Sequence, residues 1–269
     1  MNFFGQIFLE QQCKKSLLIT GIDPDFSKIP EIFKKKGGLL VWGKRIVDET
    51  FQYSVAYKPN IAFFSACSQH ELVLEKLIKY IHEKGGLVIL DSKRGDIGNT
   101  AKQYSIETFD RYCADAVTLS PYLGPDTIEP YLKYEEKGLI LLCRTSNPGA
   151  STFQNLKLKN GKRLYEQVAH DFTQWAILNK CQSRLGLVVG ATAPKELRKV
   201  RKIVGDDIHI LIPGIGIQSG DVEKTVKAGQ NSEGGGIIIS SSGAINYAVD
   251  PGLVANQTRL EINKHRFFV

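Results

Sequence analysis

Apolar residues along this chain gather in eight short runs, each followed by Gly, Pro, Ser or a charged residue. Polar segments with helical spacing lie between the runs, among them 69–83, 164–178 and 194–203. Short apolar runs are typical of strands buried on both faces, and their alternation with helices predicts parallel βα units. The expected strands cover residues 17–21, 55–57, 87–90, 116–119, 139–143, 185–189, 208–212 and 237–239.

Eight βα units predict an α/β protein with a closed (β/α)8 (TIM) barrel rather than an open sheet. The whole chain of 269 residues suits a single barrel domain, because such barrels typically have about 250 residues. Residues 1–15 predict a short N-terminal amphipathic helix with Phe3, Phe4, Ile7 and Phe8 on one face. No apolar run approaches the roughly 18 residues that a membrane span needs, so no membrane partner is expected.

The formal charge of +7 suits an anionic partner. No Lys/Arg block is interleaved with aromatic residues, so nucleic acid is not expected and a small phosphorylated substrate fits better. The cysteines are odd in number, scattered and without C-x-x-C spacing, which predicts reduced, mostly buried thiols in a cytoplasmic protein, with neither a disulfide framework nor a zinc site. They are Cys13, Cys67, Cys113, Cys143 and Cys181.

Charged residues stand where the third apolar run ends, in LVILDSKRGDIGNT. Strand alternation places Asp91 and Lys93 on the same side, and Asp96 falls in the loop beyond. Lys58 ends the second run in AYKPN. Alone, the D-x-K element would be a solvated turn and Lys58 a surface lysine. Because functional groups of a barrel gather at the carboxyl ends of its strands, their convergence predicts an active site.

The other strand ends add polar groups to the same rim. The eighth strand ends in three serines and Gly243, leading into a helix and suited to donate backbone N–H groups to a phosphate. The remaining candidates are Asp23 and Asp25 after the first strand, Lys58 and Asn60 after the second, Ser120 after the fourth, Ser146 and Asn147 after the fifth, and Gln218 in the glycine-rich loop after the seventh.

Four segments resemble the orotidine 5'-monophosphate decarboxylase family, in its longer bacterial branch: DSKRGDIGNT, AYKPN, RTSNPGA with FQ following, and PGIGIQSGD. The resemblance runs from about Ile19 to Tyr247. It implies a (β/α)8 homodimer with shared active sites that converts orotidine 5'-monophosphate to UMP and CO2, the last step of de novo pyrimidine synthesis, with no metal or cofactor.

The resemblance also implies roles for individual residues. Lys58, Asp91, Lys93 and Asp96 would form a charged catalytic tetrad, with Asp96 and Thr100 reaching into the partner subunit's site. Asp23 rather than Asp25 would bind the ribose, and Ile97 and Ser146 would meet the pyrimidine. The loop that closes over base and phosphate would carry Pro213, Ile215 and Gln218, and Ser242 and Gly243 would lie at the phosphate.

One position departs from the family pattern. The family's eighth strand leads to a phosphate-binding arginine in a context like S-S-R-x-I, whereas this chain reads Ser241-Ser242-Gly243-Ala244-Ile245. Gly243 therefore stands where the arginine is expected, and a weaker phosphate site is the consequence.

Two other functions remain open. A magnesium-dependent sugar-phosphate decarboxylase or synthase of the same superfamily would carry an acidic residue in place of Lys58, to give the metal a second carboxylate. A nucleotide-binding protein that has lost catalysis would explain Gly243 but not the intact tetrad.

Overall fold

The strands of this protein form one parallel sheet of eight, as seen in a computed structural model that describes residues 1–66, 71–215 and 221–267. The sheet order is β2-β1-β8-β7-β6-β5-β4-β3, so each strand lies beside a neighbour in sequence. The strands are β1 (Leu18–Ile22), β2 (Ala56–Pro59), β3 (Ile89–Arg94), β4 (Ala116–Leu119), β5 (Gly138–Arg144), β6 (Leu185–Val189), β7 (His209–Pro213) and β8 (Ile237–Ser241).

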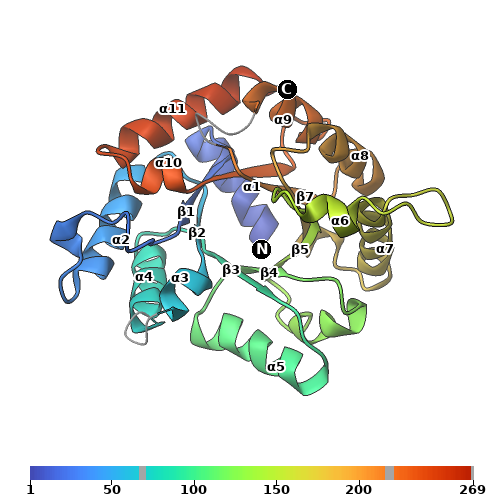
Figure 1. Cartoon of the computed structure of the whole chain (residues 1–269), viewed down its shortest axis with the longest axis horizontal. Helices are drawn as coiled ribbons and strands as arrows, with labels where there is room; N and C mark the ends of the chain where they lie inside the picture. The colour runs from blue at the N-terminus through green and yellow to red at the C-terminus, as the bar shows by residue number, and fades with distance from the viewer. Residues whose placement is uncertain (67–70, 216–220, 268–269) are drawn as a thin grey trace.

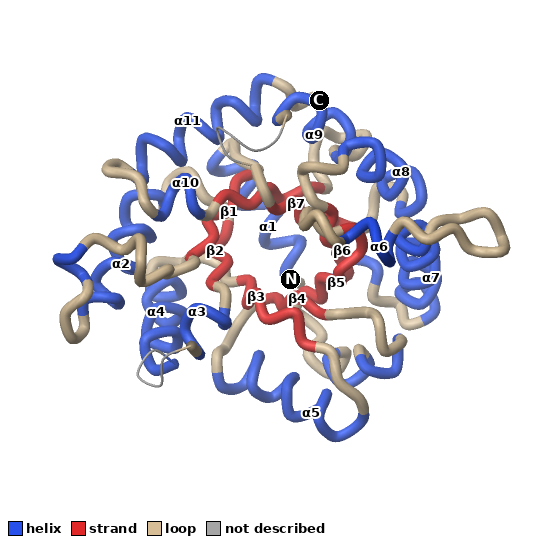
Figure 2. The backbone as a smooth tube through the Cα atoms, in the orientation of Figure 1, coloured by secondary structure: helices blue, strands red, loops and turns tan. Residues whose placement is uncertain are grey.

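The two ends of the sheet meet and close the barrel. Isolated parallel bridges join Tyr57 to Val88 and Asn60 to Asp91, which places β2 beside β3. Figure 2 shows the strands as a ring with helices around it. The predicted (β/α)8 barrel and all eight predicted strand positions are confirmed, with boundaries shifted by a few residues at most.

Helices cover the outside of the ring (Figure 1). The predicted helices appear as α4, α7 and α8; residues 69 and 70 of the first lie outside the described residues. The helices are α1 (Phe3–Lys14), α2 (Gly38–Thr50), α3 (Ile61–Ser65), α4 (Glu71–Glu83), α5 (Gly98–Ile106), α6 (Ala150–Gln154), α7 (Leu164–Leu178), α8 (Pro194–Val204), α9 (Val222–Gly229), α10 (Gly243–Asn246) and α11 (Pro251–Lys264). Single 3₁₀ turns cover Glu31–Phe33, Pro125–Thr127, Glu129–Tyr131 and Gln182–Arg184, and a π-helical turn covers Glu107–Arg111.

Helix α1 closes the amino-terminal end of the barrel. Its Phe3, Phe4 and Ile7 are buried in one cluster with residues that point into the barrel, such as Ile140 and Ile238. Figure 1 shows α1 through the ring of strands. The predicted position of Phe8 on the buried face is wrong, because its side chain is 48% exposed. Gln11 is buried instead, and its amide donates a hydrogen bond to the carbonyl of Ile237.

The cysteines only partly follow the expected burial. Cys143 and Cys181 are buried, whereas Cys13 and Cys113 are exposed, so the expectation of mostly buried thiols is wrong for two of the four that are described. All four are free thiols, and Cys67 lies outside the described residues. Across the described ranges, no helix is both long enough and apolar enough to cross a membrane.

Candidate active site

A cavity of about 1190 Å³ opens at the carboxyl ends of the strands. It lies at the end opposite α1, where barrels of this type place their functional groups. The lining residues come from all around the rim and are Asp23, Lys58, Asp91, Lys93, Thr118, Leu142, Thr145, Ser146, Asn147, Gln154, Val188, Leu211, Pro213, Gly214, Ile215, Ser240, Ser241, Ser242, Gly243 and Ala244.

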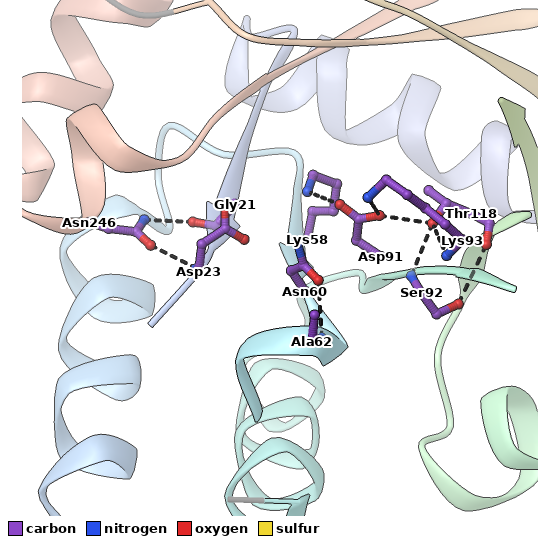
Figure 3. A network of polar contacts seen from close by, with 10 residues as sticks. All are labelled: Gly21, Asp23, Lys58, Asn60, Ala62, Asp91, Ser92, Lys93, Thr118 and Asn246. Carbon is purple, nitrogen blue, oxygen red and sulfur yellow. Dashed lines mark hydrogen bonds and ion pairs between the residues drawn. The ribbon is translucent and has the colours of Figure 1, made fainter. Parts of the chain in front are cut away.

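Asp91 is the centre of a charged array at the base of this cavity (Figure 3). Its Oδ2 atom lies 2.6 Å from Nζ of Lys58, and its Oδ1 atom lies 2.5 Å from Nζ of Lys93. The side chains of Lys58 and Asp91 are only 6% and 8% exposed, whereas that of Lys93 is 48% exposed. Lys58 is therefore a buried counter-ion of the carboxylate, and Lys93 is the more accessible cation for a molecule in the cavity.

The pKa values of this pair follow from burial and from charge. Burial alone would raise the pKa of Asp91, but the positive charges and hydrogen bonds of Lys58 and Lys93 outweigh it and hold that pKa well below its usual range. Burial would lower the pKa of Lys58, but the charges of Asp91 and Asp23 raise it. Both groups are thus charged at neutral pH, and the cavity carries fixed charges.

Lys93 meets Asp91 through an irregularity in β3 rather than through simple strand alternation. The pairing of β3 with β4 shifts between Leu90 and Arg94, and Lys93 has a φ of 49°. A lysine seldom adopts this left-handed conformation, which is costly for residues with a Cβ atom. The predicted meeting of the two side chains is confirmed, but the reason given from strand periodicity is wrong.

Asp23 follows β1, the strand beside β2, and lines the same cavity as Lys58. Its backbone N–H donates to Asn246 Oδ1 at 2.9 Å, and Tyr247 donates its hydroxyl to the carbonyl of Asp23. Asn246 Nδ2 also donates to the carbonyl of Gly21 at 2.6 Å. These contacts from the end of α10 and the residue after it hold the end of β1 in place. Oδ1 of Asp23 is buried and has no hydrogen-bond partner. Such an atom is suited to accept a hydrogen bond from a ligand.

The carboxylate of Asp25, unlike that of Asp23, has its own hydrogen-bond partners. Its carboxylate accepts hydrogen bonds from the backbone and the hydroxyl of Ser27 and forms an ion pair with Lys28. These contacts, with the Ser27 hydroxyl first, lower the pKa of Asp25 to about 2. Asp25 is not among the cavity residues, so its carboxylate stabilises the local turn, and Asp23 is the acid that faces the cavity.

The loop after β5 is braced by its own side chains. Gln154 accepts a hydrogen bond from the backbone N–H of Thr145 and donates one to its hydroxyl, each at 2.9 Å. The same hydroxyl donates to Asn147 Oδ1 at 2.7 Å. Ser146 stands between them and lines the cavity, so its position is fixed by the residues on either side.

The end of β8 supplies small polar residues. Ser240, Ser241, Ser242 and Gly243 line the cavity, and the buried hydroxyl oxygen of Ser241 has no hydrogen-bond partner. A Cβ atom built on Gly243 would meet no atom within 4 Å. None of the lining residues, all of which belong to the described part of the chain, is an arginine.

The structure brings together most of the predicted site residues. Lys58, Asp91, Lys93, Asp23, Ser146, Pro213, Ile215, Ser242 and Gly243 all line the cavity. Asp96, Ile97 and Thr100 do not: they lie on the β3–α5 loop and the first turn of α5, where Ile97 is 60% exposed. The predicted Gln218 lies outside the described residues.

Besides Asp25, sequence reasoning named two strand-end residues that do not line the cavity, and it missed several that do. Asn60 caps α3 by accepting a hydrogen bond from the N–H of Ala62, and Ser120 is not a lining residue. Thr118 was missed because it lies inside an apolar run, and Thr145 because it carries no charge. Asn246, which does not line the cavity but holds the end of β1, was missed because it follows the eighth strand at a distance. Gln154 was present in the FQ segment that follows RTSNPGA. No three His, Cys, Asp or Glu side chains of the described residues gather as metal ligands.

Fold and cavity together define a parallel (β/α)8-barrel protein with a charged pocket at the carboxyl ends of its strands. In barrels of this type that rim carries the active site. Comparison with known proteins gives the family. The model of the orotidine 5'-phosphate decarboxylase / HUMPS family matches residues 43–258.

The similarity extends over the whole chain. An orotidine 5'-phosphate decarboxylase of Cupriavidus metallidurans is 49% identical, with 99% of both chains covered. The solved structure of Leishmania donovani OMP decarboxylase is 34% identical, with a TM-score of 0.87 and 100% of both chains covered. Leishmania donovani UMP synthase gives 35% identity and a TM-score of 0.88, over 98% of this chain and 56% of that longer one. The chain belongs to the orotidine 5'-phosphate decarboxylase / HUMPS family.

Proposed function

We propose that this protein is a carboxy-lyase that converts orotidine 5'-monophosphate to UMP and CO2 without a metal or cofactor. Family membership and the names of the relatives support this assignment. The observation that carries it is the charged array of Lys58, Asp91 and Lys93 in the cavity. A pure nucleotide-binding site gains little from a buried carboxylate held between two ammonium groups, since burying such charges is costly.

The chemistry explains why such an array is useful. Loss of CO2 from the substrate leaves a pair of electrons at C6 of the pyrimidine, with no adjacent group to delocalise it. A cation near C6 stabilises the developing charge and can then protonate the carbon. Lys93 is suited to this role, because it is the exposed cation of the array.

Asp91 and Lys58 would set the field around that cation. Two unit charges 4 Å apart interact by about 4 kcal/mol at an effective dielectric constant of about 20, so an array fixed before the substrate arrives can change a rate by orders of magnitude. Asp91 beside the departing carboxylate would disfavour the bound substrate, and Lys58 would keep Asp91 in place and ionised.

The rest of the cavity fits the rest of the nucleotide. We assign the ribose to Asp23, whose unpartnered Oδ1 atom can accept a hydrogen bond from a ribose hydroxyl. Ser146 would contact the pyrimidine, and Pro213 and Ile215 would cover it, together with Gln218. The phosphate would lie at the backbone N–H groups around Ser242 and Gly243, since Gly243 replaces the arginine that the family pattern places there.

The active sites are proposed to be shared between two subunits. Asp96, Ile97 and Thr100 are displayed on an exposed loop and helix turn and do not line the cavity of their own chain. In a homodimer they would complete the cavity of the other subunit, with Asp96 as the fourth charge of the array.

A direct assay tests the function. Purified protein should lower the ultraviolet absorbance that distinguishes orotidine 5'-monophosphate from UMP, and EDTA should leave the rate unchanged. Lys93→Ala should keep the fold, judged by circular dichroism, and retain less than about a thousandth of the turnover, as expected when a proton donor is lost. Loss of activity in EDTA would favour the magnesium-dependent alternative, and a folded but inactive parent chain would favour the nucleotide-binding one.

A further inference from the structure

We propose that the hydroxyl of Thr118 is the positioning group of this active site. It holds the end of β3 in the unusual conformation that brings Lys93 back onto Asp91. The expected effect of this hydroxyl on kcat rests on the proposed decarboxylase function, whereas its expected effect on the backbone of β3 does not.

The first observation is the mismatch between β3 and β4. Leu90 pairs with Val117 and Arg94 pairs with Leu119. Asp91, Ser92 and Lys93 therefore stand opposite the single residue Thr118. A bulge of this kind leaves backbone groups without ladder partners, and buried N–H groups need a partner.

The second observation is that the Thr118 side chain supplies those partners. Its Oγ1 atom accepts hydrogen bonds from the backbone N–H groups of Ser92 and Lys93, both at 3.0 Å (Figure 3). Lys93 is the residue with a φ of 49°. The hydroxyl therefore stabilises the bulge at the residue whose backbone is strained.

The third observation concerns the hydroxyl proton. A threonine hydroxyl has one O–H donor and two lone pairs, and here the backbone uses both lone pairs. The donor points to Oδ1 of Asp91 at 2.9 Å, the oxygen atom that also contacts Nζ of Lys93. One hydroxyl thus fixes the backbone of Lys93 and the carboxylate that its side chain contacts.

Burial makes this role difficult to replace. As whole residues, Thr118 is 1% exposed and Asp91 is 6% exposed, so little room is left for a water molecule to replace the hydroxyl. Without it, the N–H groups of Ser92 and Lys93 would lack an acceptor, and the bulge would lose its support. Small displacements of a catalytic group can cost a factor of about 100 in rate, so Thr118 should act on kcat through Lys93.

The experiment compares Thr118→Val, which keeps the shape but removes the hydroxyl, with Thr118→Ser, which keeps the hydroxyl. For orotidine 5'-monophosphate, Thr118→Val should lower kcat by about 10- to 100-fold and change KM by less than about threefold. Thr118→Ser should stay within about threefold of the parent kcat. The proposal is overturned if Thr118→Val keeps the parent kcat, or if Thr118→Ser loses as much as Thr118→Val.

A matched control separates positioning from stability. Thr20 is a fully buried strand threonine whose hydroxyl contacts Ser54 at 2.6 Å and which does not line the cavity. Thr20→Val should lower the unfolding temperature but leave kcat unchanged. An equal loss of kcat in Thr20→Val would show that any buried hydroxyl of the barrel matters, and would overturn a special role for Thr118.

A second readout does not depend on activity. Hydrogen exchange in a peptide that contains Ser92 and Lys93 should be faster in Thr118→Val than in the parent and in Thr118→Ser, and unchanged exchange overturns the proposal. If Thr118→Val does not fold, Thr118→Cys is used in its place, because a thiol is a weaker donor and acceptor of similar size. A parental kcat together with a parental exchange rate in Thr118→Cys then overturns the proposal. A parent chain without turnover refutes the proposed function, and the exchange comparison then decides the role of Thr118 alone.

Discussion

At the scale of single residues, the carboxylate of Asp91 determines the electrostatics of the cavity. Three side chains contact it, and two of them are cations, so the ionised form is strongly favoured. The buried cation Lys58 depends on Asp91 in turn, because a charge with so little access to water needs a partner. Removing the carboxylate should therefore lower the free energy of unfolding by more than the loss of an ordinary ion pair does.

Asp91→Asn should destabilise the protein by about 3–5 kcal/mol at neutral pH, because it leaves Lys58 buried and unpaired. The pKa of Asp91 is lowered in the folded state, so its stabilisation is fully present above the unfolded value of about 3.9 and is lost as the pH falls below it. The difference in unfolding free energy between parent and variant should therefore narrow below about pH 4. Urea unfolding at a series of pH values measures this.

Asp25→Asn is the control, because that carboxyl also has a lowered pKa but lies in an exposed turn with Ser27 and Lys28. Its loss should change the unfolding free energy far less than Asp91→Asn. Equal effects at the two positions would contradict the special cost of leaving Lys58 unpaired.

Gly243 gives a second prediction at this scale. The backbone of Gly243 is not in the left-handed region, and a Cβ atom there would meet no atom within 4 Å, so neither the backbone nor the start of the side chain opposes an arginine. Gly243→Arg should lower KM for orotidine 5'-monophosphate and raise kcat/KM by roughly 10- to 100-fold, which corresponds to a charged hydrogen bond of about 1.5–3 kcal/mol. Steady-state kinetics of the variant measure both constants.

Two comparisons identify the source of any gain. Gly243→Ala adds a side chain without charge and should leave kcat/KM near that of the parent. Orotidine, which lacks the phosphate, should show no gain with Gly243→Arg. A lower kcat/KM in a folded Gly243→Arg variant would mean that other groups already bind the phosphate fully.

The sequence reveals the charged residues of this site better than its neutral ones. Lys58, Asp91 and Lys93 stand out because charges are unusual at the ends of buried apolar runs. Thr118 does not, because threonine is an ordinary residue inside a strand and nothing local indicates that three residues of β3 will face it. Residues such as Asn246 support the site from a distant part of the chain, and a local pattern does not indicate which strand end they will meet.

At the scale of elements, the packing of α1 against the barrel depends on a position without a Cβ atom. The periodicity of its apolar residues predicted a helix, but not that Phe8 would be exposed while Gln11 is buried. The fit of α1 also depends on the floor of the barrel, where Gly186 of β6 lies against Phe4. A Cβ atom at Gly186 would lie 2.8 Å from Cζ of Phe4, so the glycine makes room for the ring.

Gly186→Ala should destabilise the protein by about 1–3 kcal/mol, because the added methyl group overpacks the floor of the barrel. Phe4→Leu, which shortens the side chain at the point of contact, should cost a similar amount through the space that it leaves. The double variant should lose clearly less than the sum of the two, since each change relieves the other. Thermal and urea unfolding of the four proteins measure this coupling.

Phe8→Ala is the matched control on the same helix, because its side chain is 48% exposed, and it should change stability little. The values of kcat and KM should stay near those of the parent in all these variants, because α1 lies at the end of the barrel opposite the cavity. Additive effects of Gly186→Ala and Phe4→Leu would contradict the direct contact between the two positions.

At the scale of the whole molecule, the alternation of strands and helices was sufficient to predict the architecture. Eight apolar runs with seven intervening connections close into a barrel because each parallel strand needs a crossover and pairs with its neighbour. The carboxyl ends of the strands then share one rim, which is why residues as far apart as Asp23 and Gly243 line one cavity. Association of this chain with a second copy does not follow from this regularity.

The last prediction concerns that association. Asp96 does not line the cavity of its own chain, and we propose that it completes the site of a second subunit. Mixing inactive Lys93→Ala chains with inactive Asp96→Ala chains should then restore activity, because each mixed dimer regains one site in which both residues are native. With random exchange of subunits in a two-fold dimer, roughly a quarter of the sites are restored.

Activity should appear only under conditions in which subunits exchange, and it should depend on the ratio of the two chains, with a maximum near equal amounts. Mixing Lys93→Ala chains with Lys58→Ala chains is the control, since Lys58 and Lys93 both contact Asp91 of their own chain and that mixture regains no native site. If the mixture with Asp96→Ala stays inactive while subunit exchange is demonstrated, Asp96 acts within its own subunit. The β3–α5 loop would then have to move toward its own cavity during the reaction.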